Sequence, residues 1–289
     1  METQAKQVKQ AAEGDAPARP RRIYRHRLPV RVMHWINVVC LTILLMSGLN
    51  IFNAHPALYW GRESTFADPW ISIGGRDTPG GTIGVTKIGG AEFVTTGVLG
   101  VSEVDGRPAV RAFPSWATIP GPQWLAMGRH WHLFFAWLFV VNGVAYVLYT
   151  IFSRHLTRDL VPTRAELRSI GSSIKNHLLF RHPEGEAARR YNVLQSLTYL
   201  LVIFVVLPLV VVAGLAMSPR LDAVYPGWVD LLGGRQSART LHFLAALALV
   251  VFTLIHVFEV IVAGVWNELR SMLTGWYTLP AERAKEVQR

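Results

Sequence analysis

The sequence predicts an all-α integral membrane protein in which a bundle of four transmembrane helices carries a small β-rich insertion. Hydrophobic residues make up 51% of the 289-residue chain and charged residues only 17%. This composition is more typical of membrane proteins than of soluble domains. The apolar residues gather in four runs, each long enough for a helix to cross about 30 Å of hydrocarbon. These predicted spans are residues 32–52, 132–152, 194–217 and 240–266.

The first predicted span follows a polar tail, residues 1–30, which ends in a basic stretch suited to anionic lipid headgroups. We expect this tail to be disordered and cytoplasmic. The apolar run behind it starts too late and is too long for a cleaved signal peptide. At the other end of the chain, the fourth span leads into a second predicted tail, residues 267–289.

The insertion between the first two spans, residues 53–131, is rich in Gly, Thr and Val. Its short β-prone runs are broken by GG, PGG and DG, which predicts two or three small hairpins outside the membrane. Two interpretations of this insertion stay open, a structural lid and a docking surface for a periplasmic partner. The third span contains Pro208, which membrane helices tolerate, and completes the predicted bundle.

Basic residues are distributed unevenly between the two sides of the predicted bundle. Residues 1–31, 153–190 and 263–289 hold 20 basic and 10 acidic residues, whereas the loops 53–131 and 218–239 hold 9 and 8. This positive-inside pattern places both termini in the cytoplasm. The net charge of +10 is thereby explained by topology, and we expect no nucleic-acid binding. The single cysteine lies inside the first span, so neither a disulfide framework nor a CxxCH motif is present.

The fourth predicted span contains two histidines, His242 and His256, fourteen positions apart. On a helix they differ by about 40° in rotation and by roughly 21 Å in depth. One face therefore presents two imidazoles at two depths. Ionisable residues inside a membrane are costly and usually functional, and haem is the ligand that such a pair suggests.

Topology assigns a partner to each of these histidines. With the N-terminus inside, His34 of the first span lies near the inner side and His132 of the second near the outer side. The fourth span runs inward, so we expect His132 to pair with His242, and His34 with His256. Bis-histidine ligation fills both axial positions of a haem iron, which suits electron transfer. The four histidines thus predict two noncovalently held b haems.

His130 also lies at the start of the second span, two positions before His132. On a helix the two side chains are about 200° apart, so at most one faces a given haem. We favour His132, which is the deeper of the two.

Further candidate cofactor-binding residues are glycines that leave room for a porphyrin. Gly48 lies fourteen residues after His34, on nearly the same face at the outer depth, and Gly143 lies eleven residues after His132, about 20° away in rotation. Arginines are candidates to bind the haem propionates. On the outer side these are Arg129, Arg235 and Arg239, and on the inner side Arg25, Arg27 and Arg31.

At these residues the chain resembles the di-haem cytochrome b membrane subunits of nickel-iron hydrogenases and respiratory formate dehydrogenases, within the bacterial cytochrome b561 group. The matching features are RVMHWIN in the first span, the histidine that opens the second, and the H-x13-H pair of the fourth. The closest likeness is to thiosulfate-reductase-like cytochrome b subunits, although the insertion 53–131 is longer than the hydrogenase type leads us to expect. The resemblance implies that His34, His132, His242 and His256 are axial ligands, and that a quinone reacts near the inner haem.

We therefore expect a multi-pass protein of the bacterial inner membrane that transfers electrons between the quinone pool and a periplasmic redox subunit. That partner would be of the molybdopterin oxidoreductase or hydrogenase type. The alternative is a stand-alone membrane cytochrome b, such as a quinone-linked superoxide oxidase or a reductase of small acceptors. A third possibility, a haem-free anchor, fits the four matched histidines poorly.

Overall fold

Four helices of the computed structural model are long and apolar enough to cross a membrane by length and composition. They are α2 (Leu28–Asn53), α3 (Leu125–Phe152), an interrupted helix over Val193–Ala216, and α9 (Arg235–Val262). The structure describes residues 22–279 except 105, 155, 157–159 and 179–192, so most of the predicted N-terminal tail and the last ten residues lie outside the described part. The four long apolar helices that the sequence predicts are therefore present.

The apolar side chains of these helices point largely outward. Only 11–22% of the residues in each apolar window are buried, and on α3 the side chains of Leu133, Phe134 and Trp137 are all more than half exposed. In water such a surface would aggregate. Hydrocarbon is the solvent that suits it, and the helices keep their backbone hydrogen bonds internal, as a lipid environment requires.

The third span is interrupted between α6 (Val193–Leu201) and α7 (Leu207–Ala216) by a π-helical turn, Val202–Val206. Pro208 lies two residues after this turn. Proline lacks a backbone N–H and its ring crowds the preceding turn, so a wider turn is an expected way to accommodate it within a helix. Four residues after the end of this turn lies Val210, whose carbonyl group contacts the candidate ligand His242.

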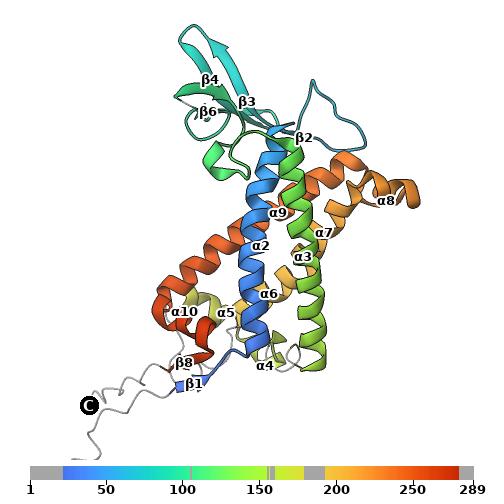
Figure 1. Ribbon diagram of the computed structural model, residues 1–289. Coiled ribbons are helices and arrows are strands. Elements are labelled where there is room, and N and C mark those ends of the chain that lie inside the picture. Colours follow the sequence, from blue (N-terminus) through green and yellow to red (C-terminus); the bar gives the residue numbers. More distant parts are fainter. Residues whose placement is uncertain (1–21, 105, 155, 157–159, 179–192, 280–289) are drawn as a thin grey trace, which may run out of the picture. The chain divides into compact units, whose positions relative to one another are not determined.

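Helices α2 and α3 lie side by side (Figure 1), and polar side-chain contacts join them. The buried Asn142 amide of α3 donates to the Met33 carbonyl at 2.9 Å and to the Asn37 side-chain oxygen at 2.7 Å. Nearer the other end, Gly128 of α3 faces Asn50 of α2, where an added Cβ would lie 3.3 Å from the amide oxygen. Small residues and amide hydrogen bonds are typical of close helix contacts in membranes.

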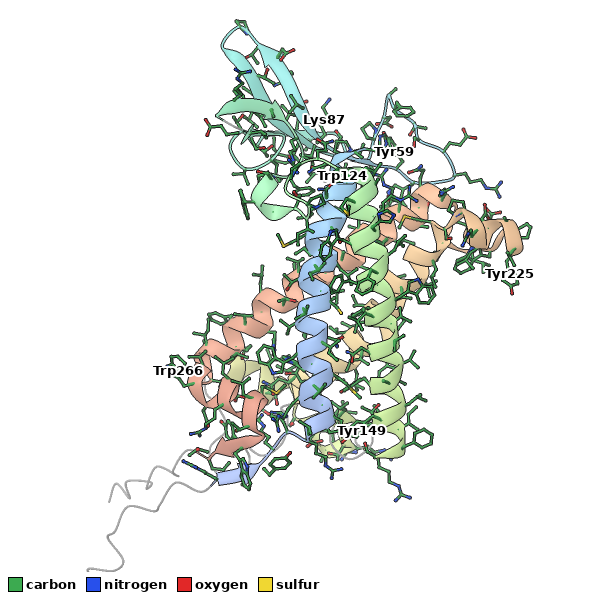
Figure 2. The ribbon with its side chains drawn as sticks, in the orientation of Figure 1. Tyr59, Lys87, Trp124, Tyr149, Tyr225 and Trp266 are labelled. Carbon is green, nitrogen blue, oxygen red and sulfur yellow. The ribbon has the colours of Figure 1, made fainter. Side chains whose placement is uncertain are left out.

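Between α2 and α3 the chain forms a β-rich cap, residues 54–124. It is shorter than the predicted insertion 53–131, because α3 already begins at Leu125. Strands β2 (Ala57–Leu58), β3 (Ile71–Thr78), β4 (Gly81–Ile88) and β5 (Ala91–Val94) form one antiparallel sheet in that order, and β6 (Val101–Val104) pairs with β7 (Arg107–Val110). Two-residue turns join β3 to β4 and β4 to β5, which explains the PGG and GG signals. Figure 2 labels Lys87 on this sheet, and Tyr59 and Trp124 where the cap meets the helices.

The cap is held to the end of α2 by a small apolar core. Phe52 of the helix packs with Leu58, Ile73 and Ala112 of the cap. Within the cap, a side chain on Gly84 would lie 2.2 Å from the Leu99 carbonyl. This glycine is therefore required by close backbone packing.

The chain divides into two compact units. The first comprises the described residues among 32–161 and 197–257, and the second those among 22–31, 162–196 and 258–279. In the second unit, β1 (Arg22–Tyr24) pairs with β8 (Trp276–Thr278), and Arg25 forms an ion pair with Glu268 at 3.3 Å. The same unit contains two short helices, α4 (Arg164–Arg168) and α5 (Ile170–Leu178). The remaining short helices are η1 (Ser115–Ala117), α8 (Pro219–Val224) and η5 (Trp228–Leu232), in the first unit.

Several boundaries differ from the prediction. The first, second and fourth spans begin at Leu28, Leu125 and Arg235, and not at residues 32, 132 and 240. The fourth span ends at Val262 and not at residue 266, because Gly264 adopts a left-handed φ of 106° that stops the helix before α10 (Val265–Thr274) begins. The predicted tails, residues 1–30 and 267–289, also contain ordered elements: β1 and the start of α2 in the first, and most of α10 with β8 in the second.

Candidate functional site

Two histidine pairs lie between helices of the first unit. His132 of α3 and His242 of α9 have ring centres 6.1 Å apart, with the rings inclined at 67°. We call them the cap-side pair, because His132 lies in the half of α3 that begins at the cap. His34 of α2 and His256 of α9 form the opposite-end pair, with ring centres 6.3 Å apart and the rings inclined at 62°. The structure thus brings together the histidines that topology paired.

Each imidazole of the cap-side pair is oriented through its Nδ1 atom. Nδ1 of His242 lies 2.7 Å from the Val210 carbonyl of α7, and Nδ1 of His132 lies 3.2 Å from the Leu44 carbonyl of α2. A carbonyl oxygen only accepts, so each Nδ1 carries the hydrogen and donates it. Each Nε2 is then left with a free lone pair, which is what a metal ligand requires.

Ser47 of α2 adds a second acceptor for His132. Its fully buried hydroxyl donates to the Ile43 carbonyl at 2.6 Å, and its oxygen lies 3.1 Å from Nδ1 of His132. Because the serine hydrogen is used within its own helix, the oxygen is available to accept from the imidazole.

Glycines give the cap-side imidazoles their room. An added Cβ on Gly48 would lie 3.4 Å from the His132 ring, and one on Gly214 of α7 would lie 3.2 Å from the His242 ring. Gly48, predicted to make room for a porphyrin, therefore contacts an imidazole. Gly143 is different, because a Cβ added there meets nothing within 4 Å; the space beside it is open.

The opposite-end pair is surrounded mainly by aromatic rings. Phe252 stacks on His256 at 5.9 Å between ring centres, and Trp35 presents an edge to His34 at 5.5 Å. Nδ1 of His34 is buried and has no hydrogen-bond partner among the described residues. Unlike the cap-side imidazoles, His34 is therefore not oriented by a carbonyl group.

His130, the alternative to His132, is exposed at the start of α3. The arginines predicted to bind haem propionates differ in their surroundings. Arg239 donates to the backbone carbonyl of His55 and lies over the Phe52 ring, 5.7 Å from its centre. Arg129 is exposed. Arg31 belongs to the other unit, where it donates to the Leu273 carbonyl.

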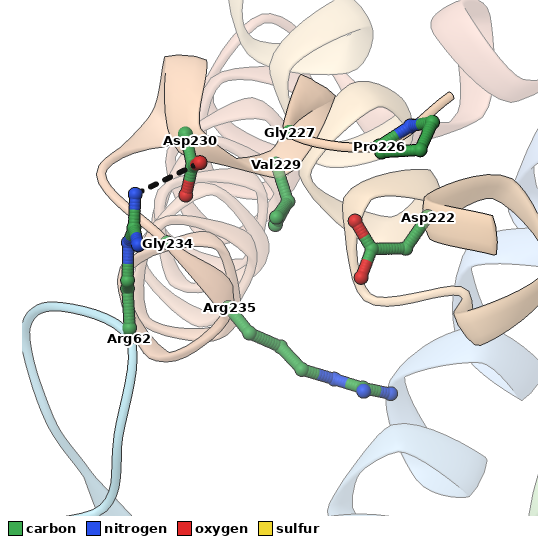
Figure 3. A pocket seen from close by; sticks show the side chains of 8 residues that line it. All are labelled: Arg62, Asp222, Pro226, Gly227, Val229, Asp230, Gly234 and Arg235. Carbon is green, nitrogen blue, oxygen red and sulfur yellow. Dashed lines mark ion pairs between the residues drawn. The ribbon is translucent and has the colours of Figure 1, made fainter. Parts of the chain in front are cut away.

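The remaining outer candidate, Arg235, donates to the Met217 carbonyl at 2.8 Å and lines a shallow pocket of about 340 Å³ (Figure 3). Two other lining residues, Arg62 and Asp230, form a largely exposed ion pair at 2.9 Å. No histidine lines this pocket, so we assign it no part in the histidine sites. Its lining residues are Arg62, Asp222, Pro226, Gly227, Val229, Asp230, Gly234 and Arg235.

Sequence reasoning missed three residues that the structure places at the cap-side pair or beside Arg239: Ser47, Gly214 and His55. Gly214 lies in a span without histidine, so no ligand drew attention to it. Ser47 directly precedes Gly48 and could have been found by asking which hydroxyl reaches the same depth as His132. His55 lies two residues after the end of α2 and had no signal of its own.

Comparisons with known proteins extend over nearly the same region. Residues 25–275 match the profile of a family described as prokaryotic cytochrome b561. Over 246 residues, the chain is 28% identical to YedZ1 of Azospira oryzae, described as a putative protein-methionine-sulfoxide reductase subunit; the match covers 85% of this chain and 93% of that protein. No solved structure was found to match.

Proposed function

This chain belongs to the prokaryotic cytochrome b561 family, and we propose that it is the di-haem cytochrome b subunit of a membrane oxidoreductase, carrying electrons between the quinone pool and an extracytoplasmic redox partner. Family membership and the four apolar helices make it a multi-pass membrane protein that binds haem b and serves electron transport. The number of haems, the ligands, the quinone and the partner are the proposal.

The observation that carries the proposal is the spacing of the two histidine pairs. A metal held between two imidazoles takes about 2.0 Å to each nitrogen, and each ring centre lies about 1.2 Å behind its nitrogen, so the ring centres stand about 6.4 Å apart. The two pairs have 6.1 Å and 6.3 Å. Two imidazoles joined by a direct N–H···N hydrogen bond would have their ring centres closer together than this.

The other contacts around the histidine pairs also fit a haem. Val210 and Leu44 hold the cap-side imidazoles with Nε2 free, and Gly48 and Gly214 leave room for the rings beside α2 and α7. The open space beside Gly143 suits a porphyrin edge near the opposite-end pair. When bound, such a haem accepts and releases single electrons, and two axial histidines leave it no open position for a substrate.

We place the cap outside the cytoplasm and the opposite-end pair near the cytoplasmic face, on the strength of the uneven distribution of Lys and Arg. Quinone would then react near the opposite-end pair and exchange its protons with the cytoplasm. Electrons would pass through the bundle to the cap-side pair.

For the partner, the relative from Azospira oryzae is the best guide, because it is named as a subunit of a putative protein-methionine-sulfoxide reductase. We infer a similar assembly here, with an extracytoplasmic oxidoreductase of the molybdopterin type docking on the cap. Such an enzyme would take two electrons and two protons to convert a sulfoxide to a thioether and water. The chain would then deliver quinol electrons outward.

Spectra of the purified protein test this proposal. We expect a reduced b-type α band and two haems per chain. Replacement of His132 or His242 by Ala should remove the cap-side haem, and replacement of His34 or His256 the other, whereas His130→Ala should retain both. Haem content near one in the unaltered protein, or loss of haem from the His130 variant with retention in the His132 variant, would contradict the assignment. Quinone reduction by a small donor without a second protein would favour a stand-alone enzyme.

A further inference from the structure

His55 and Arg239 lie side by side at the cap-side end of the bundle, and neither has the partner that its chemistry demands. The Nε2 atom of His55 is buried without a hydrogen-bond partner among the described residues. Arg239 is half-buried, and no carboxylate of the described residues pairs with it. Buried polar atoms and poorly hydrated charges are costly when unpaired. Both groups are hydrogen-bond donors that suit an anion.

The position of this pair of residues relates it to the cap-side histidines. Arg239 precedes His242 by three residues on α9, about one turn nearer the cap. His55 lies two residues after the end of α2 and seven residues after Gly48, which contacts His132. Both donors therefore lie on the cap side of His132 and His242, and a group held between these imidazoles could extend toward them.

The site is also rigidly built. Besides the bond from Arg239 to the His55 carbonyl, the hydroxyl of the fully buried Thr240 donates to the Tyr59 carbonyl at 2.6 Å, and the Gly61 N–H donates to Ser237 at 2.8 Å. Tyr59 stacks on His55 with ring centres 5.6 Å apart. Residues 55–61 are thus fixed along the first turns of α9 before any ligand arrives, which lowers the entropic cost of binding.

Electrostatics agree with this assignment. Burial lowers the pKa of His55, and the neighbouring Arg239 guanidinium lowers that pKa further. The imidazole is therefore neutral at pH 7, and it can present an N–H at Nε2 beside a permanent positive charge. A carboxylate satisfies both, by a charge-assisted pair with the arginine and a hydrogen bond from the histidine.

We propose that His55 and Arg239 together form a carboxylate-binding site that holds a propionate of the cap-side haem. The inference rests on the proposed function, since it presupposes a haem between His132 and His242. It adds His55 to the cofactor-binding residues. It also selects Arg239 over the exposed Arg129 among the cap-side arginines.

Haem titration of the full-length protein, produced in haem-limited cells, tests the proposal with two probes. The probes are haem b and its dimethyl ester, in which both propionates are blocked. The variants are His55→Gln and Arg239→Gln, each with a matched control from the start of α3, His130→Gln and Arg129→Gln. We expect His55→Gln and Arg239→Gln each to weaken cap-side haem binding by on the order of tenfold or more, as loss of a hydrogen bond to a charged group predicts. The controls should bind as the unaltered protein does.

The ester separates a propionate contact from a structural effect. If His55 binds a propionate, the unaltered protein should hold the ester more weakly than haem b, and His55→Gln should cause little further loss. Equal losses for haem b and the ester would mean that His55 acts only through the fold or receives a carboxylate from elsewhere, and would overturn the proposal. So would a His55→Gln variant that binds haem b as tightly as the unaltered protein.

A potentiometric titration of the holoprotein gives a second readout. Removing the positive charge of Arg239 beside the cap-side haem should shift its midpoint potential to lower values, and Arg129→Gln should leave it unchanged. An unshifted potential in Arg239→Gln would contradict the site. If the unaltered protein takes up no haem at all, the proposed function falls, and this inference with it. If it takes up two and His55→Gln behaves normally, only this inference falls.

Discussion

Gly214 of α7 leaves just enough room for the imidazole of His242. A Cβ there would lie 3.2 Å from two ring atoms, a distance at which the ring has to move. Gly214→Val should therefore displace His242 from its Val210 carbonyl. We expect a loss of about 1–3 kcal/mol in stability, the usual cost of overpacking, together with selective loss of the cap-side haem. Thermal unfolding and the ratio of haem to protein measure the two effects.

Gly171→Val is the matched control for this substitution, since Gly171 also lies in a helix, α5, and has nothing within 4 Å of an added Cβ. It should leave stability and haem content close to those of the unaltered protein. A Gly214→Val variant that keeps both haems would show that His242 tolerates displacement, and that the carbonyl contact does not determine its orientation.

At the scale of elements, the contact between the cap and α9 depends on a few buried hydrogen bonds. Thr240 is fully buried, and its hydroxyl is bound to the Tyr59 carbonyl at 2.6 Å. Thr240→Val keeps the shape but leaves that carbonyl unpaired, at a cost of about 1–3 kcal/mol. We expect a lower unfolding temperature and faster amide hydrogen exchange in residues 57–61.

Thr253→Val, on the same helix, is the control for Thr240→Val. The Thr253 hydroxyl is bound only to the Leu249 carbonyl one turn earlier in α9, and its side chain is exposed, so removing it should change little. Equal exchange rates for residues 57–61 in the two variants would mean that the Thr240 hydroxyl does not hold the cap.

The elements that could be predicted are those whose signal is local. Span length follows from apolar runs, and the cap hairpins follow from GG and PGG turns. The pairing of β1 with β8 could not be predicted, because its partners are more than 250 residues apart and three-residue strands show no alternation. The early end of α9 depends on Gly264, one of many glycines in apolar segments, and only its left-handed backbone distinguishes it.

The same division applies to the candidate site. Depth and topology were sufficient to pair the histidines, because a helix fixes both rotation and rise. The contacts that orient these histidines could not be predicted from the sequence. The Val210 carbonyl and Gly214 lie on a span without any candidate ligand, and His55 reaches Arg239 only because residues 55–61 fold along α9. Such contacts join distant segments, and no local pattern encodes them.

For the whole molecule, the proposed path of electrons depends on which side of the membrane the cap occupies. The chain has a single cysteine, Cys40, which is completely buried, so one introduced cysteine at a time reports its own side. Gly90→Cys places a thiol in the exposed turn between β4 and β5, where an added Cβ meets nothing. Lys175→Cys places one on the exposed face of α5.

From the excess of basic residues in 153–190 and the near balance in 53–131, we expect a membrane-impermeant maleimide to label Gly90→Cys in intact spheroplasts. It should label Lys175→Cys only after permeabilisation, and the unaltered protein in neither condition. Labelling of Lys175→Cys alone in intact spheroplasts would mean that the protein has the opposite orientation in the membrane. The cap would then face the cytoplasm, quinone would meet the other histidine pair, and a partner docked on the cap would have to be cytoplasmic.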